Sequence, residues 1–171
     1  METNEERSIF VTVGTTRFDE LVKAVASEQF IKLAISKGYN KMVVQAGKST
    51  FIPEVVNNTQ FHTEVYQYKD TLKHDMQEAS LIISHGGAGT TLEALTLDKP
   101  LIVVINDQLA GNHQTELAYQ LQQDQHLIAT HFGDLLETVR RLDPSNLKSY
   151  QPGNPKLFGE FLDRMMGFDN V

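Results

Sequence analysis

The residues with the clearest chemistry in this chain are three glycines that lie between a short apolar run and a helical pattern. They belong to Ser84-His85-Gly86-Gly87-Ala88-Gly89-Thr90-Thr91, which directly follows Leu81-Ile82-Ile83. A strand that ends in a glycine-rich turn and continues into a helix offers free backbone N–H groups and the positive end of the helix dipole to an anion. Glycines also let a ligand approach the backbone closely. The turn from His85 to Thr90 therefore predicts a site for a phosphorylated ligand.

Two familiar nucleotide-binding motifs are present only in part in this chain. Gly47-Lys48-Ser49-Thr50 looks like the end of a Walker A loop, but the glycine required five residues earlier is Met42. The turn at Gly87 begins like a dinucleotide fingerprint, but its third glycine falls at Leu92. The sequence thus argues against a nucleoside triphosphatase and against a nicotinamide or flavin enzyme.

Two ionisable side chains near the turn allow more than one interpretation. Thr90 and Glu93 have the spacing of a capping box, in which both side chains satisfy backbone donors at a helix start. Alternatively, Glu93 faces the ligand and accepts hydrogen bonds from a ribose diol. His85 could donate to a phosphate, act as a base or pack in the core, and the spacing leaves all three roles open.

The sequence contains none of the usual metal-binding patterns. It has no HExxH motif, no paired histidines, no carboxylate cluster and no Asp-x-Asp. We therefore expect no metal and no cofactor, and we expect backbone donors and a helix dipole to neutralise a bound diphosphate.

Short β-branched runs alternate with helical patterns along most of the chain, which predicts an α/β fold. Strands of four to six residues separated by helices indicate a mostly parallel, Rossmann-like sheet with helices on both faces. The predicted strands are Ile9–Val13, Lys41–Gln45, Glu64–Tyr68, Leu81–Ser84, Leu101–Ile105 and His126–Ala129. The predicted helices are Asp19–Ser27, Gln29–Lys37, Leu72–Glu78, Thr90–Leu97, Gln114–Gln123 and Asp134–Arg141.

Ligands of open α/β sheets bind beyond the carboxyl ends of the strands. This rule selects four segments: Gly14-Thr15-Thr16, Gln45-Ala46-Gly47, the turn from His85 to Thr90, and the loop from Asn106 to Gln114. The last segment ends in Asn112-His113-Gln114, whose side chains are rich in hydrogen-bonding groups. We expect these segments to meet at one edge of the sheet.

Composition limits the class of protein. The 171 residues predict one domain over 1–171, and a net charge of −7 argues against a nucleic-acid binder. The chain has no cysteine, which excludes disulfides and thiolate chemistry. Its first residues show no secretory signal, and its longest apolar run, Leu101 to Ile105, is too short to span a bilayer. These features predict a cytosolic protein without a transmembrane segment.

The C-terminal region differs from the rest of the chain. Residues 143–155 carry three prolines and a glycine and are predicted to be a linker. Residues 156–168 are predicted to be a helix that docks either on its own domain or on a second chain. Its apolar stripe consists of Leu157, Phe158, Phe161, Leu162, Met165 and Met166.

Four segments carry a resemblance to a known family. They are Val11-Thr12-Val13-Gly14-Thr15-Thr16-x-Phe18, Ser84-His85-Gly86-Gly87-Ala88-Gly89-Thr90, Lys99-Pro100-Leu101-Ile102-Val103-Val104 and Asn112-His113-Gln114-x-Glu116-Leu117-Ala118. In these segments the chain resembles the eukaryotic subunits that add the second N-acetylglucosamine to the dolichol-linked oligosaccharide precursor of asparagine-linked glycosylation. It is more distantly similar to the C-terminal half of bacterial MurG, in glycosyltransferase family 28. The resemblance implies the donor-binding half of a GT-B glycosyltransferase.

The resemblance also implies roles for individual residues. Gly14, Thr15, Thr16 and the turn from His85 to Thr90 would hold the donor diphosphate, while Tyr68 and Lys69 would bracket the uracil. Glu93 would bind the ribose, which can coexist with a capping role. Asn112, His113 and Gln114 would recognise the sugar hydroxyls, and Gln45 and Gly47 would line the same cleft. No residue is assigned as the general base, for which His85 is the local candidate.

The implied reaction is an inverting, metal-independent transfer of N-acetylglucosamine from UDP-N-acetylglucosamine to a dolichyl-diphosphate-linked sugar. One Rossmann-like unit lacks the acceptor-binding half of a GT-B enzyme, so a second chain is expected to supply it. In the resembled family that partner is a membrane-anchored subunit at the cytosolic face of the endoplasmic reticulum. The apolar stripe from Leu157 to Met166 is the expected docking surface. The alternative is a non-catalytic module of the same fold that binds nucleotide sugars or has a regulatory role.

Overall fold

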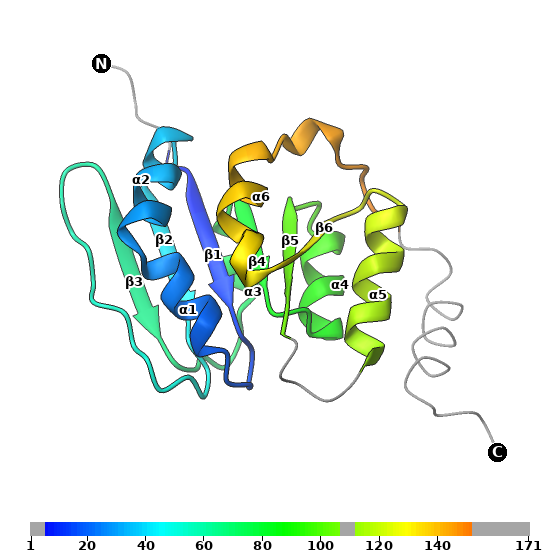
Figure 1. Cartoon of the computed structure of the whole chain (residues 1–171), viewed down its shortest axis with the longest axis horizontal. Coiled ribbons are helices and arrows are strands. Elements are labelled where there is room, and N and C mark those ends of the chain that lie inside the picture. The colour runs from blue at the N-terminus through cyan, green and yellow to red at the C-terminus, as the bar shows by residue number, and fades with distance from the viewer. Residues whose placement is uncertain (1–5, 107–111, 152–171) are drawn as a thin grey trace.

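The computed structural model of the chain describes residues 6–106 and 112–151, which form a sheet of six parallel strands with helices on both faces (Figure 1). The strands are β1 (Ser8–Thr12), β2 (Lys41–Gln45), β3 (His62–Tyr66), β4 (Leu81–Ser84), β5 (Leu101–Ile105) and β6 (Ile128–His131). The helices are α1 (Asp19–Ala26), α2 (Glu28–Ser36), α3 (Lys73–Glu78), α4 (Ala88–Thr96), α5 (Asn112–Gln123) and α6 (Leu135–Arg141), with 3-10 turns η1 (Phe132–Asp134) and η2 (Pro144–Asn146).

The strand order is β3-β2-β1-β4-β5-β6, and all pairs are parallel. The chain winds outward from β1 to β3, then returns to the middle and winds outward again from β4 to β6. The direction of winding reverses between β1 and β4, which is the point where doubly wound sheets bind their ligands. This topology confirms the predicted Rossmann-like α/β fold.

Two hydrophobic layers cover the faces of the sheet. Because successive side chains of a strand point to opposite faces, Ile9 and Val11 pack under α1, α2 and α6, while Phe10 packs with α3, α4 and α5. Figure 1 shows the first group of helices in front of the strands. Strand β5 is buried along its whole length, as expected when helices cover both sides of a continuous apolar run.

All six predicted strands and all six predicted helices are present, and the differences concern their ends. Strand β3 lies two residues earlier than predicted and β6 two residues later, because each is defined by pairing with its neighbour, Lys41 with His62 and Ile105 with His131. Helices α4 and α5 reach two residues further toward the N-terminus, to Ala88 and Asn112. Strand pairing and the position of a helix cap depend on tertiary contacts, which the local sequence pattern does not contain.

The segment that follows α6 packs against the domain as far as the structure describes it. The Lys148 N–H donates to the Gln125 carbonyl at 2.8 Å, and Tyr150 makes an edge-on contact with His126 at 5.3 Å between ring centres. The remainder of the predicted linker, the predicted helix 156–168 and its apolar stripe lie outside the described residues. Within the described residues, no helix is long and apolar enough to cross a bilayer.

Candidate functional site

The turns after β1 and β4 lie side by side at the point where the winding reverses. Strands β1 and β4 are paired through Thr12 and Ser84, and the N–H of His85 continues the ladder by donating to the Thr12 carbonyl at 3.1 Å. Gly14 and Gly86 have φ values of +61° and +87°, a backbone conformation that side chains rarely allow. The topology thus brings together the two glycine-containing segments predicted to hold a diphosphate.

The imidazole of His85 lies between these two turns. A Cβ atom placed on Gly14 would be 2.7 Å from Cε1 of His85, and one placed on Gly87 would be 2.8 Å from its Nε2. Both distances are shorter than real Cβ contacts allow. A side chain at either position would displace the histidine ring, and at Gly14 the positive φ would add backbone strain.

His85 is a buried and electrically neutral group. Its side chain is 7% exposed, and its Nδ1 has no hydrogen-bond partner among the described residues. Burial lowers the pKa of the imidazole, so that it is uncharged at neutral pH. A buried polar atom without a partner is uncommon in proteins, which makes this ring a candidate contact for a ligand.

Helix α4 begins at Ala88 with Gly87 as its N-cap, and no side chain caps it. Thr90 is therefore the third residue of the helix, and of the two interpretations of Thr90 and Glu93 the capping box is the one that the structure does not show. The N–H groups of the first turn are left for a ligand. Glu93 is half-buried, and its carboxylate makes no hydrogen bond or ion pair with the part of the chain described here.

Gln114 joins the site from helix α5. It lines a small hollow together with His85, Gly86, Val103 and Asn106. The prediction that the start of α5 lies near the glycine turn is thus met by the geometry at Gln114. Asn112 and His113 lie in the first turn of the same helix.

The segment after β3 carries Tyr68, whose side chain is 52% exposed, and Lys69. The Nζ atom of Lys69 lies 2.9 Å from the Asp75 carboxylate and 4.1 Å from the centre of the Tyr66 ring. Tyr66 also donates to Asp75, at 2.5 Å, and burial together with this carboxylate raises the pKa of its phenol. Asp75 therefore neutralises Lys69 and orders this segment, a role that no local pattern indicated.

The loop after β2 packs directly on the turn after β1. The N–H of Lys48 donates to the Thr16 carbonyl at 2.9 Å, and the Ser49 hydroxyl accepts from the Phe18 N–H at 3.1 Å. Gln45 is 2% exposed, and its amide is hydrogen-bonded inside the protein. Gln45 and Gly47 are predicted to line the cleft. In the structure both lie against the turn from Gly14 to Thr16 and support it.

Asp19 fastens the same loop to the start of α1. Its carboxylate accepts from the N–H groups of Thr50 and Phe51, each at 2.7 Å, and pairs with Arg17 at 2.5 Å. An acidic residue in the first turn of a helix is visible in the sequence, but its partners lie 31 and 32 residues away. Asp19 therefore holds the loop at Thr50 and Phe51 against the start of α1.

We expect the free energy of unfolding to depend on pH through Asp19. The hydrogen bond from Phe51, helped by Arg17 and Thr50 and opposed by burial, lowers the pKa of this carboxyl from 3.8 to about 2. Its contribution, about 2 kcal/mol, is complete above the unfolded pKa and is lost as pH falls from there toward the folded pKa. Urea unfolding at a series of pH values should show a smaller acid-dependent loss in Asp19→Asn. Identical acid dependence in both proteins would contradict this role.

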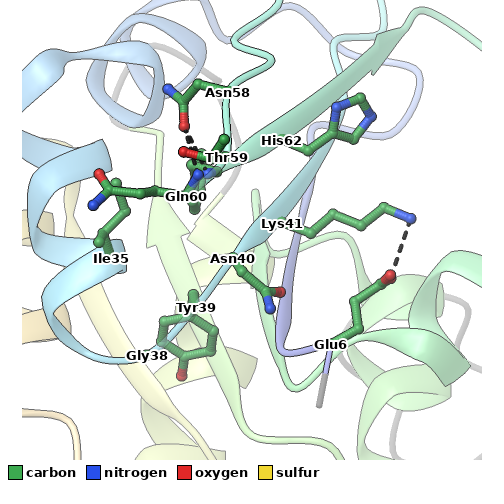
Figure 2. A pocket seen from close by; sticks show the side chains of 11 residues that line it. Glu6, Ile35, Gly38, Tyr39, Asn40, Lys41, Asn58, Thr59, Gln60 and His62 are labelled. Atoms are coloured by element: carbon green, nitrogen blue, oxygen red, sulfur yellow. Dashed lines mark hydrogen bonds and ion pairs between the residues drawn. The ribbon is translucent and has the colours of Figure 1, made fainter. Parts of the chain in front are cut away.

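Two further features of the described residues bear on the location of the site. Among residues 6–106 and 112–151, no three histidine or carboxylate side chains cluster where they could hold a metal ion. A hollow of about 620 Å³ lies at the opposite, amino ends of β2 and β3, where Lys41 pairs with Glu6 at 3.3 Å (Figure 2). The length of the strands separates this hollow from the glycine turns.

The chain is similar to known glycosyltransferase proteins. Residues 8–156 match the model of the glycosyltransferase family 28 C-terminal domain. The UDP-N-acetylglucosamine transferase subunit ALG13 of Homo sapiens is 49% identical over 121 residues, which are 71% of this chain and 11% of that one. The subunit of the same name from Yarrowia lipolytica is 32% identical over 136 residues, 78% of this chain and 69% of that one.

Two solved structures share the fold. An NMR structure of ALG13 has a TM-score of 0.70 at 23% identity, covering 95% of this chain and 98% of that one. Acinetobacter baumannii MurG has a TM-score of 0.65 at 17% identity, and the match covers 97% of this chain but 51% of that one. The domain described above therefore corresponds in fold to about half of a MurG chain.

Proposed function

Since the chain belongs to the family of glycosyltransferase family 28 C-terminal domains, we propose that it is the donor-binding subunit of a UDP-N-acetylglucosamine transferase. The chain spans about a tenth of the length of its human relative, so the activity of a whole enzyme is part of this proposal. The single observation that carries it is the pair of glycine turns closed around a buried imidazole at the start of a helix without a side-chain cap.

The proposed chemistry is electrostatic. Departure of UDP develops negative charge on the diphosphate, and donors that are already oriented at a helix N-terminus stabilise that charge. The backbone from Gly86 to Thr90, with Gly14, Thr15 and Thr16, would contact the diphosphate, and a neutral His85 can donate one further hydrogen bond. This set needs no metal or cofactor, and we propose inverting transfer without one.

The remaining donor contacts follow the arrangement around the turns. Glu93, half-buried and without a partner among the described residues, would accept from the ribose hydroxyls. Tyr68 and Lys69 would bracket the uracil, and Gln114, with Asn112 and His113 in the same helical turn, would meet the sugar. The hollow shared by Gln114 and His85 supports this placement, because the sugar follows the diphosphate in the donor.

We further propose that a second chain completes the enzyme. The domain corresponds in fold to about half of a MurG chain, and the relatives are themselves named as subunits. The partner would be membrane-anchored and would bring this chain to the cytosolic face of the endoplasmic reticulum. It would bind the dolichyl-diphosphate-linked N-acetylglucosamine acceptor of the second step of lipid-linked oligosaccharide synthesis.

The test is binding followed by transfer. Calorimetry with the full 171-residue chain should detect UDP and UDP-N-acetylglucosamine, with little dependence on added Mg²⁺. Transfer to the lipid-linked acceptor should require the partner that the chain captures. Absence of donor binding, alone or with the partner, would overturn the assignment. Donor binding without transfer in the complex would support the alternative, a non-catalytic module of the same fold.

A further inference from the structure

The side-chain amide of Gln45 makes an unusual set of contacts at the carboxyl end of β2. Its Oε1 accepts from the Gly14 N–H at 2.8 Å and from the Thr12 hydroxyl at 2.6 Å. Its Nε2 donates to the Gly14 carbonyl at 2.7 Å and to the Gln67 carbonyl at 2.6 Å. The two N–H donors and both acceptor positions of the amide are therefore filled.

These contacts join two segments that belong to different parts of the candidate site. Gly14 begins the turn that faces the second glycine turn, and Gln67 directly precedes Tyr68 and Lys69. The side chain that connects them is 2% exposed, so it is enclosed by the protein on all sides. Gln45 can therefore act on a ligand through the segments that it holds, and not by touching it.

Gly14 depends on this amide more than an ordinary sheet residue would. Its φ of +61° takes it out of the strand conformation. Its carbonyl accepts from the Gln45 amide, and its N–H donates to the Gln45 Oε1 at 2.8 Å and to the Thr12 hydroxyl at 3.1 Å. A partly buried carbonyl that loses its donor carries a desolvation cost, and the Gly14 carbonyl receives its donor from Gln45. The length and planarity of the glutamine side chain therefore help to set the position of Gly14.

We propose that Gln45 is a positioning residue that fixes the spacing between the turn at Gly14 and the segment after Gln67. The inference rests on the proposed function, in which the first segment takes the diphosphate and the second takes the uracil. A ligand that touches one segment can follow it when it shifts. A ligand that touches both loses alignment at one end, so UDP should be affected more than either of its parts.

Two variants separate the contacts of the amide. Gln45→Glu keeps the size of the side chain but replaces the Nε2 donors with an oxygen that faces two carbonyls. Gln45→Met keeps the length and removes all polar contacts. Thr63→Val is the matched control, because Thr63 is a buried polar residue of the adjacent strand β3 whose hydroxyl accepts from the Val56 N–H at 2.6 Å. Thr63 lies toward the amino end of that strand, away from the turns.

NMR titration with UDP, UMP and inorganic pyrophosphate measures the three affinities in the full chain, below the melting temperature of each variant. We expect the Kd for UDP to rise roughly tenfold or more in both Gln45 variants, with less than about a threefold change for UMP and for pyrophosphate. Thr63→Val should lower the melting temperature without changing any of the three. Equal weakening of all three ligands, or an unchanged Kd for UDP in a folded variant, would overturn the proposal.

The unmodified protein provides a test that does not depend on variant folding. Pyrophosphate alone should slow hydrogen exchange at the amides of Gly14 and, through Gln45, at Tyr68 and Lys69. Protection confined to the Gly14 turn would overturn the coupling. If the unmodified chain binds neither UDP nor UDP-N-acetylglucosamine, the proposed function fails instead, so the two failures are distinguishable.

Discussion

Replacing Gly47 by alanine is expected to weaken UDP binding by roughly ten- to hundredfold and to lower the free energy of unfolding by about 2 kcal/mol. A Cβ atom at this position would lie 2.5 Å from the Gly14 carbonyl oxygen and 2.7 Å from that of Thr16. Both are backbone atoms, which cannot rotate out of the way as a side chain can. The φ of +54° adds strain of its own. The turn from Gly14 to Thr16 must therefore move.

Calorimetry with UDP and urea unfolding measure the two effects, and Gly133→Ala is the control. Gly133 lies in η1, and a Cβ atom there would meet nothing within 4 Å. We expect this control to match the unmodified protein in both measurements. A Gly47→Ala protein that binds UDP within about twofold of the unmodified chain would show that the turn does not contact the ligand.

The substitution Glu93→Gln is expected to weaken UDP binding by roughly tenfold or more and to leave the melting temperature unchanged. A carboxylate accepts hydrogen bonds from a ribose diol more strongly than an amide does, because its charge assists both bonds. Helix α4 starts at Ala88 without a side-chain cap, and the Glu93 carboxylate has no partner among the described residues. Its removal should therefore leave the stability of the helix intact.

Glu78→Gln is the matched control for this measurement. Glu78 ends α3, and its carbonyl accepts from the hydroxyl of Ser8 at the first residue of β1, so it lies at the opposite edge of the sheet. Calorimetry and thermal melts of both variants test the assignment. A fall in melting temperature with unchanged UDP affinity would show that Glu93 serves the helix and not the ligand.

The order of strands and helices could be predicted from the sequence because each element carries its own period of apolar residues. Leu101 to Ile105 is one such run, and its complete burial confirms the prediction that helices cover both faces. The start of α4 could not be placed from the Thr90 and Glu93 pattern. Gly87 takes the cap position instead, since the chain leaves β4 through the tight turn at Gly86.

The glycine turn from His85 to Thr90, and the prediction that it binds a phosphorylated ligand, come from the sequence alone. Strand, turn and helix are contiguous there, so local spacing contains the whole arrangement. The tertiary structure decided how that turn is supported. Gln45 reaches Gly14 across 31 residues, and Asp19 reaches Phe51 across 32. Such contacts depend on the order β3-β2-β1-β4 and on the register between strands, which side-chain packing over the whole sheet determines.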